Sequence, residues 1–318
     1  MKLSYSTFFK GAGMGAADAV PGVSGGTIAI ITAIYEELIH TIKQFGPGAF
    51  VVWRRGGWQA LVEYLNLRFL LPLVAGIFVS LFSVAHVVTW LLQEQTVLLN
   101  AFFFGLVLAS AIVVRHRMET WLWRYLPALL IGIVLAQWLP TLMPGIAMLG
   151  APSLMLMAAG AIAISAMLLP GVSGSFLLLT MGLYGTVMEG IKAGDLMLLL
   201  PFGLGCLLGL LCFSRLLSWL LIRHHDATLQ LLIGFIIGSL PTLWPWRELL
   251  SYQLGPDEQM IPLEYRYLLP HDYAVLTGES AHMISALALM LVGVILVLAI
   301  SRYANSPNHS HKEDDSHA

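Results

Sequence analysis

The segment that decides the fold occurs twice: residues 21–27 read PGVSGGT, and residues 170–176 read PGVSGSF. The similarity around these two motifs follows a constant offset of 149 residues. After a change of length the offset becomes 129, and it then pairs Gly76 with Gly205. A series of matches at two fixed offsets indicates an internal duplication rather than a chance recurrence.

The composition is that of a membrane protein. Hydrophobic residues make up 58% of the 318 residues and charged residues only 11%, whereas soluble proteins carry about 25% charged residues. An ordinary soluble enzyme is therefore excluded. Nucleic-acid binding is also excluded, because 16 Lys and Arg against 18 Asp and Glu leave no basic surface. Cys206 and Cys212 lack metal-ligand spacing, and the sequence implies neither a metal nor a cofactor.

The apolar runs predict an all-α polytopic membrane protein. Six runs are long enough to span a bilayer: about 69–92, 96–114, 125–142, 199–221, 228–244 and 282–300. Two further apolar stretches, 5–42 and 151–191, are broken near their middles by Pro and Gly, and each is expected to form a helical hairpin. The hairpins are either re-entrant or fully crossing. The predicted organisation is a first repeat over 1–150, a second over 151–303 and a disordered cytoplasmic tail over 304–318.

The charges between the spans predict their orientation. Loops 43–68 and 115–124 are basic, whereas 245–279 carries six acidic residues against two basic ones. The positive-inside rule then places both termini in the cytoplasm. Three spans separate the two hairpins, an odd number, so the repeats are expected to be inverted. A parallel duplication is the alternative, and it would need one more crossing and a poorer charge distribution.

The two motifs are the candidate binding site. Inverted repeats with Pro/Gly-broken helices at matching positions are typical of transporters. A helix that begins inside a membrane presents unpaired N–H groups and a positive dipole end, which suit an anion. The candidate phosphate-binding residues are Ser24, Gly25, Gly26, Thr27, Ser173, Gly174 and Ser175. The alternative is a re-entrant turn that only caps its own helix.

Four ionisable residues in or near the apolar runs are further candidates. Arg215 lies inside the 199–221 run, where it could contact a substrate phosphate or extend its side chain to the interface. Asp18, Glu36 and His86 are candidates for coupling transport to an ion, since carboxylates and histidines can carry protons or bind cations. Structural roles at packed interfaces are the alternative for Asp18, Glu36 and His86.

The chain resembles a bacterial membrane family associated with polyprenyl-phosphate, or undecaprenyl phosphate, translocation. The resemblance rests on residues 17–27 (ADAVPGVSGGT), the following Tyr35-Glu36, and residues 170–175 (PGVSGS) with Gly182-x-Tyr184. It covers essentially the whole chain except the tail.

The resemblance implies a lipid transporter rather than an enzyme. Such a flippase would return undecaprenyl phosphate, the C55 lipid carrier, from the outer to the inner leaflet of the bacterial cytoplasmic membrane for new peptidoglycan synthesis. The implied partners are this carrier, membrane lipid and a coupling ion, either H⁺ or Na⁺. The oligomeric state stays open, and a homo-oligomer is compatible with the sequence.

Two other functions compete with this one, and a purely structural membrane scaffold is a further alternative. A transporter of a small soluble anion would share the same motifs, and the sequence does not distinguish it. The membrane-bound undecaprenyl pyrophosphate phosphatases carry a similar Pro-Gly-x-Ser-Arg-Ser motif. Gly25 and Gly174 stand at its Arg position here, so the charge that would stabilise a transferring phosphoryl group is missing and hydrolysis is disfavoured.

Overall fold

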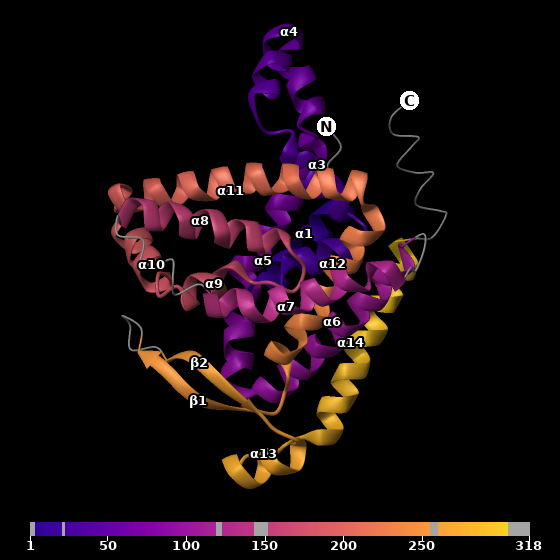
Figure 1. The fold of residues 1–318 in the computed structure, drawn as a ribbon, viewed down its shortest axis with the longest axis vertical. Helices are drawn as coiled ribbons and strands as arrows, with labels where there is room; N and C mark the ends of the chain where they lie inside the picture. Colours follow the sequence, from indigo (N-terminus) through magenta and orange to yellow (C-terminus); the bar gives the residue numbers. More distant parts are fainter. Residues whose placement is uncertain (1–3, 21–22, 119–122, 143–151, 255–259, 305–318) are drawn as a thin grey trace.

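The computed structural model describes residues 4–20, 23–118, 123–142, 152–254 and 260–304, and it is built almost entirely of helices (Figure 1). The first half contains α1 (Tyr5–Asp18), α2 (Gly25–Ile31), α3 (Tyr35–Lys43), α4 (Pro47–Tyr64), α5 (Leu67–Glu94), α6 (Thr96–His116), η1 (Trp123–Tyr125) and α7 (Leu126–Leu142). The second half contains α8 (Pro152–Leu168), α9 (Gly174–Thr180), α10 (Tyr184–Ala193), α11 (Leu196–Arg223), α12 (His225–Ser239), η3 (Leu240–Leu243), β1 (Arg247–Leu254), β2 (Met260–Tyr267), α13 (Pro270–Thr277) and α14 (Met283–Ala304).

Five described helices are long and apolar enough to cross a membrane, or six if the bent pair α9–α10 forms one span. The five are α5, α6, α11, α12 with η3, and α14. They coincide with five of the runs that hydropathy predicts. The sixth predicted run corresponds to α7, whose described part has 17 residues. The prediction of an all-α membrane protein is confirmed at this level.

Each Pro/Gly-broken stretch forms three helices rather than the two arms that the sequence suggests. The first break is the PGVSG motif, and a second follows one short helix later. At this second break Ala33 (φ 62°) and Gly182 (φ 71°), which are 149 residues apart, both adopt the left-handed conformation. The second break bends α9 against α10 by 107°. Of the two short helices between the breaks, α2 is almost entirely buried, whereas α9 buries only Gly174, Leu177 and Leu178.

Glycines at matching positions bring the long helices into close contact. α1 packs on α5, and α8 packs on α11. A Cβ on Gly76 of α5 would collide with the carbonyl of Phe8, and a Cβ on Gly205 of α11 would collide with that of Met157. Phe8 and Met157 are 149 residues apart, whereas the two glycines are 129 apart. The duplicated sequence therefore produces the same helix–helix seam twice, as small residues do in membrane helices generally.

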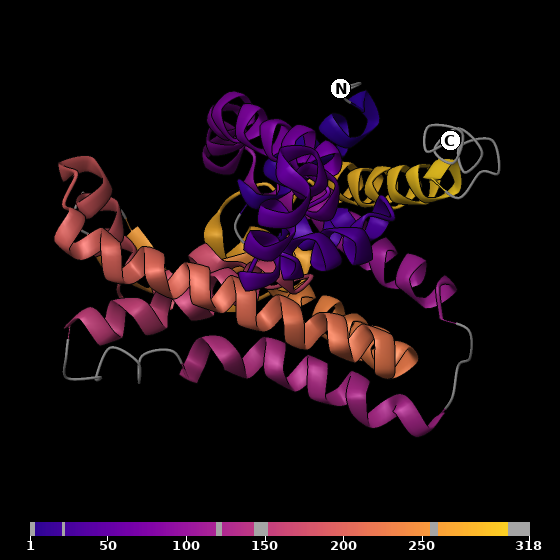
Figure 2. The same ribbon diagram turned by 90° about the horizontal axis from the view of Figure 1, so that it is seen from above.

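The remaining long helices pair across the two halves. α6 packs on α14, and α7 packs on α12. Figure 2 shows α8, α10 and α11 extending to one side of the molecule and α14 to the other. The main hydrophobic core lies between these halves, around α2, α3, α6 and α12, with Ile31, Val107 and Ile236 among its fully buried residues. α2 lies in this core, whereas α9 packs in a second cluster, in which Leu177 lies with Ala163 of α8 and Phe235 of α12.

The sequence did not predict regular structure in residues 244–254 and 260–282, which form a small cap. β1 and β2 form an antiparallel hairpin, which α13 follows at the lower end of Figure 1. The indole N–H groups of Trp244 and Trp246 donate to the carbonyls of Leu268 and Ala281, each at 2.8 Å. Burial raises the pKa of Tyr273 in α13 to about 12. The two tryptophans thus anchor the cap to the ends of α12 and α14.

Candidate functional site

The first motif begins helix α2 and has its N-terminal donors already satisfied. Ser24 is the N-cap, and its Oγ accepts a hydrogen bond from the N–H of Gly26 at 3.1 Å. The N–H of Gly25 donates to the Asp18 carboxylate at 2.6 Å. Pro21 and Gly22 lie outside the described residues. An anion that approaches this helix end therefore meets a carboxylate that already occupies it.

The first motif also caps the end of the helix that leads to the second motif. Ser24 Oγ lies 3.2 Å from the carbonyl of Leu169 and 3.4 Å from that of Met167, and it can donate to either. The Tyr35 hydroxyl donates to the carbonyl of Leu168 at 2.8 Å. The last carbonyls of a helix lack intrahelical partners and need such donors when they are buried. Ser24 and Tyr35 therefore join the two motifs into one central site.

A further bond ties the motifs together directly. The N–H of Gly171 donates to Thr27 Oγ1 at 3.1 Å, and Thr27 is fully buried. Gly171 has φ of 80°, and a Cβ there would lie 2.6 Å from Ser239 Oγ of α12. Both the backbone conformation and the space require glycine at this position. From the sequence alone, Gly171 is explained only as a turn glycine, because Ser239, the residue against which it packs, lies 68 residues further along the chain.

The second motif is more open than the first. Ser173 is the N-cap of α9, with its Oγ 3.5 Å from the N–H of Phe176 and 2.9 Å from Ser175 Oγ. Ser24 and Thr27 are buried, whereas Ser175 is exposed and Ser173 is partly exposed. Two adjacent hydroxyls at a helix N-terminus are suitable hydrogen-bond donors for an anion.

One substitution between the repeats explains why the two helix ends differ. At the offset of 149 the counterpart of Asp18 is Met167. A Cβ on Gly25 would lie 2.6 Å from Asp18 Oδ2, and a Cβ on Gly174 would lie 2.7 Å from Met167 Cγ. The side chains thus occupy equivalent places, but only the first is an anion. The difference was readable in the sequence as an Asp/Met mismatch within the repeat.

The other candidate residues lie apart from this centre. The Arg215 guanidinium donates to the carbonyls of Leu211 at 2.8 Å and Phe45 at 2.9 Å, so it joins α11 to the segment after α3. Within the described residues, neither of these Arg215 bonds is with a motif residue. His86 lies in α5, and its side chain is outside the described part of the structure.

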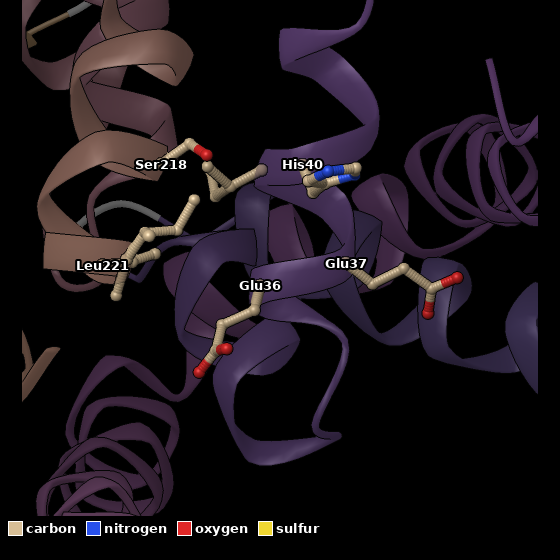
Figure 3. Close-up of a pocket in the computed structure, with 7 residues that line it drawn as sticks. Glu36, Glu37, His40, Ser218 and Leu221 are labelled. Carbon is tan, nitrogen blue, oxygen red and sulfur yellow. The ribbon is translucent and has the colours of Figure 1, made fainter. Parts of the chain in front are cut away.

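Glu36 lines a pocket of about 310 Å³ between α3 and α11. Figure 3 shows that its carboxylate points away from that of Glu37. Glu36 Oε1 lies 3.5 Å from His225 Nε2, and Lys43 donates to Ser218 on the far wall at 3.1 Å. His225 and Lys43 were not among the predicted residues, because neither lies in a motif. The pocket has a mostly apolar lining, with Glu36, Glu37, His40 and Ser218 as its polar members, and it does not include residues of the PGVSG motifs.

The fold and site together define a helical membrane protein with a duplicated, Pro/Gly-broken core, the class to which secondary transporters belong. A family model described as undecaprenyl phosphate translocase-like matches residues 14–260. The chain belongs to this family.

Two relatives are named polyprenyl-phosphate transporters. One, from Vibrio cholerae serotype O1, is 42% identical over 299 residues, which cover 94% of this chain and 96% of the relative. The other, from Staphylococcus aureus, is 31% identical over 260 residues, which cover 77% and 87%. Both are transporters rather than enzymes, in agreement with the sequence prediction. No solved structure matches the chain.

Proposed function

We propose that this protein is a flippase that moves undecaprenyl phosphate from the outer to the inner leaflet of the bacterial cytoplasmic membrane. The observation that carries the proposal is the similarity to the Vibrio cholerae polyprenyl-phosphate transporter over nearly the full length of both chains. The returned carrier would serve peptidoglycan and other envelope polysaccharides. Its phosphate needs a polar path through the protein, while its isoprenoid chain can stay in lipid.

The proposed architecture is an inverted repeat with both termini in the cytoplasm. Its support is the odd number of spans between the motifs, the basic loops at 43–68 and 115–124, and the equivalent seams at Gly76 and Gly205. In this arrangement α2 and α9 approach the centre from opposite sides. The N-terminus of each helix can then bind the phosphate on its own side of the membrane, one after the other.

The proposed head-group site in this conformation is the second motif, Ser173, Gly174 and Ser175. Its hydroxyls are accessible, and Met167 leaves the helix end without a competing charge. The first motif, Ser24 to Thr27, would become accessible only after its bonds to Asp18 and α8 break. Binding to one motif at a time allows release as well as capture, because neither site carries a fixed cation.

Coupling to H⁺ or Na⁺ would use Asp18 or Glu36, with His86 as a third candidate. Asp18 holds Gly25, and Glu36 pairs with His225, so both carboxylates are placed where a bound proton would change a helix contact. Arg215 remains a candidate for phosphate contact, for which it would have to leave the carbonyl of Phe45.

Leaflet-resolved translocation of undecaprenyl phosphate in proteoliposomes tests the function and the site together. We expect protein-dependent movement that falls at least about tenfold in Ser173→Ala/Ser175→Ala, since each lost hydrogen bond to a charged group costs about 1.5–3 kcal/mol. Ser24→Ala/Ser173→Ala should also cost more than either single change. Ser165→Ala is the matched control, because in the described part of the chain that hydroxyl donates to the carbonyl of Ala161 within α8 and to no other group.

The possible results of this experiment test the flippase function and the head-group site separately. If the lipid does not move under an imposed pH or sodium gradient, although the protein is correctly inserted, the flippase proposal is wrong and uptake of a small soluble anion is measured next. If the lipid moves and Ser173→Ala/Ser175→Ala moves it at the wild-type rate, the function stands and the head-group site is elsewhere.

A further inference from the structure

Helix α4 stands clear of the rest of the molecule, at the top of Figure 1. All 18 of its residues are described, and none is buried. It consists of two arms, residues 47–56 and 58–64, which reverse direction at Gly57 (φ 70°). The arms lie side by side, since a Cβ on Gly48 would lie 2.9 Å from the Tyr64 hydroxyl. An element with no buried residue is not there to complete the protein core.

The side chains that α4 exposes are large and apolar. Trp58 is 66% exposed, Phe50 55%, Trp53 48% and Val51 46%. The Phe50 and Trp53 rings are 5.8 Å apart, so they form one surface rather than isolated residues. Exposing such an apolar surface to water is unfavourable in free energy. Tryptophan in particular favours the boundary between lipid head groups and acyl chains.

Basic side chains adjoin this aromatic surface. Arg54 and Arg55 are exposed next to Trp53, and the Arg54 guanidinium lies 6.0 Å from the Phe50 ring centre. Glu63 is the single acidic residue of the 43–68 loop. Aromatic residues together with arginines match the chemistry of a bilayer surface that carries anionic lipids, where the rings enter the interface and the guanidinium groups pair with head groups.

We propose that α4 is a membrane-surface arm that docks onto anionic lipid of the leaflet around the protein's cytoplasmic side. The proposal rests on the cytoplasmic orientation of loop 43–68 proposed above. α4 is joined directly to α5 and lies three residues after α3, which lines the Glu36 pocket and carries Tyr35 of the central site. Docking would therefore hold the segment between α3 and α5 at a fixed height relative to the bilayer.

The test measures where α4 lies, without measuring transport. A spin label is attached at Val51→Cys in the full chain, with Cys206→Ser and Cys212→Ser to remove the other thiols. The protein is placed in nanodiscs of phosphatidylcholine alone or with phosphatidylglycerol. Collision of the label with oxygen, which partitions into lipid, is compared with collision with a water-soluble nickel chelate. In discs with phosphatidylglycerol, we expect the label to be reached mainly by oxygen.

Arg54→Glu/Arg55→Glu should move the label into water. The two arginines are expected to favour the docked position on the order of 30-fold in anionic discs. The matched control is Arg223→Glu/Arg302→Glu, which makes the same charge change at two exposed arginines on other helices. The control should leave the label in lipid.

Three results would overturn the proposal. A label that stays in water in both lipid compositions means that α4 stands free or takes a protein partner. A label that is in lipid regardless of phosphatidylglycerol and of the arginines means that no anionic lipid is recognised. If the control variant moves the label into water to the same extent, the total charge of the protein, rather than the arginines of α4, determines where the label lies. Translocation is not part of the readout, so failure of the flippase proposal would be seen separately.

Discussion

At the scale of single residues, the most informative difference is that between Asp18 and its repeat counterpart Met167. Both side chains sit against the first glycine of a motif helix, but Asp18 accepts a hydrogen bond at 2.6 Å and a methionine cannot. A charge-assisted bond of this kind is about twice as strong as a neutral one. A phosphate that approached Gly25 would therefore have to compete with this carboxylate.

A carboxylate introduced on the other side should close the second motif as well. We expect Met167→Asp to lower the affinity for a short-chain polyprenyl phosphate at least about tenfold, because like charges repel strongly at short range in a medium of low polarity. Met167 is 40% exposed, so the change should be tolerated in the fold. Met167→Asn has the same shape without the charge and should bind nearly normally. Equal loss in both variants would show that size, rather than charge, controls the site.

At the scale of elements, hydropathy predicts the spans well and the short helices poorly. The run 199–221 corresponds to α11, Leu196–Arg223. A long apolar segment in lipid forms a helix because its backbone N–H and C=O groups must be hydrogen-bonded within the segment. The breaks at Ala33 and Gly182 and the β1–β2 hairpin were not predicted. Their cause is packing between distant segments, as in the bond of Ser24 to Leu169 across 145 residues. Residue patterns within one segment do not contain that information.

The glycine seam between α8 and α11 offers a test within one helix. Gly205→Ala should destabilise the protein by about 1–3 kcal/mol, since the new methyl group would collide with the carbonyl of Met157. Gly203 is two residues away and has no atom within 4 Å of its Cβ position, so Gly203→Ala should be neutral or slightly stabilising. Thermal unfolding in detergent compares the two. If both variants melt at the same temperature, α8 and α11 are not in close contact.

At the scale of the whole molecule, the structure is asymmetric although its sequence is duplicated. The first motif reaches across to the carbonyls that end α8, through Ser24 and Tyr35. In the described residues no corresponding bond runs from Ser173 or Tyr184 to the end of α1. If the repeats are inverted as proposed, two equivalent sets of groups, of which one is engaged, are what alternating access requires. The opposite conformation would exchange them, with Tyr184 reaching the carbonyl of Ala19, the counterpart of Leu168.

Removing one hydroxyl should shift the balance between these two conformations. Tyr35→Phe loses its bond to Leu168, which should weaken the present conformation by about 1 kcal/mol, or roughly fivefold. The readout is the rate at which a membrane-impermeant thiol reagent modifies Ser175→Cys, in a background with Cys206→Ser and Cys212→Ser. Ser175 is exposed in the present conformation, so Tyr35→Phe should slow its modification from that side. Tyr184→Phe is the matched control and should leave the rate unchanged or raise it, because its hydroxyl is engaged only in the opposite conformation. The same slowing in both variants would contradict the exchange and would mean that the two tyrosines support one static structure.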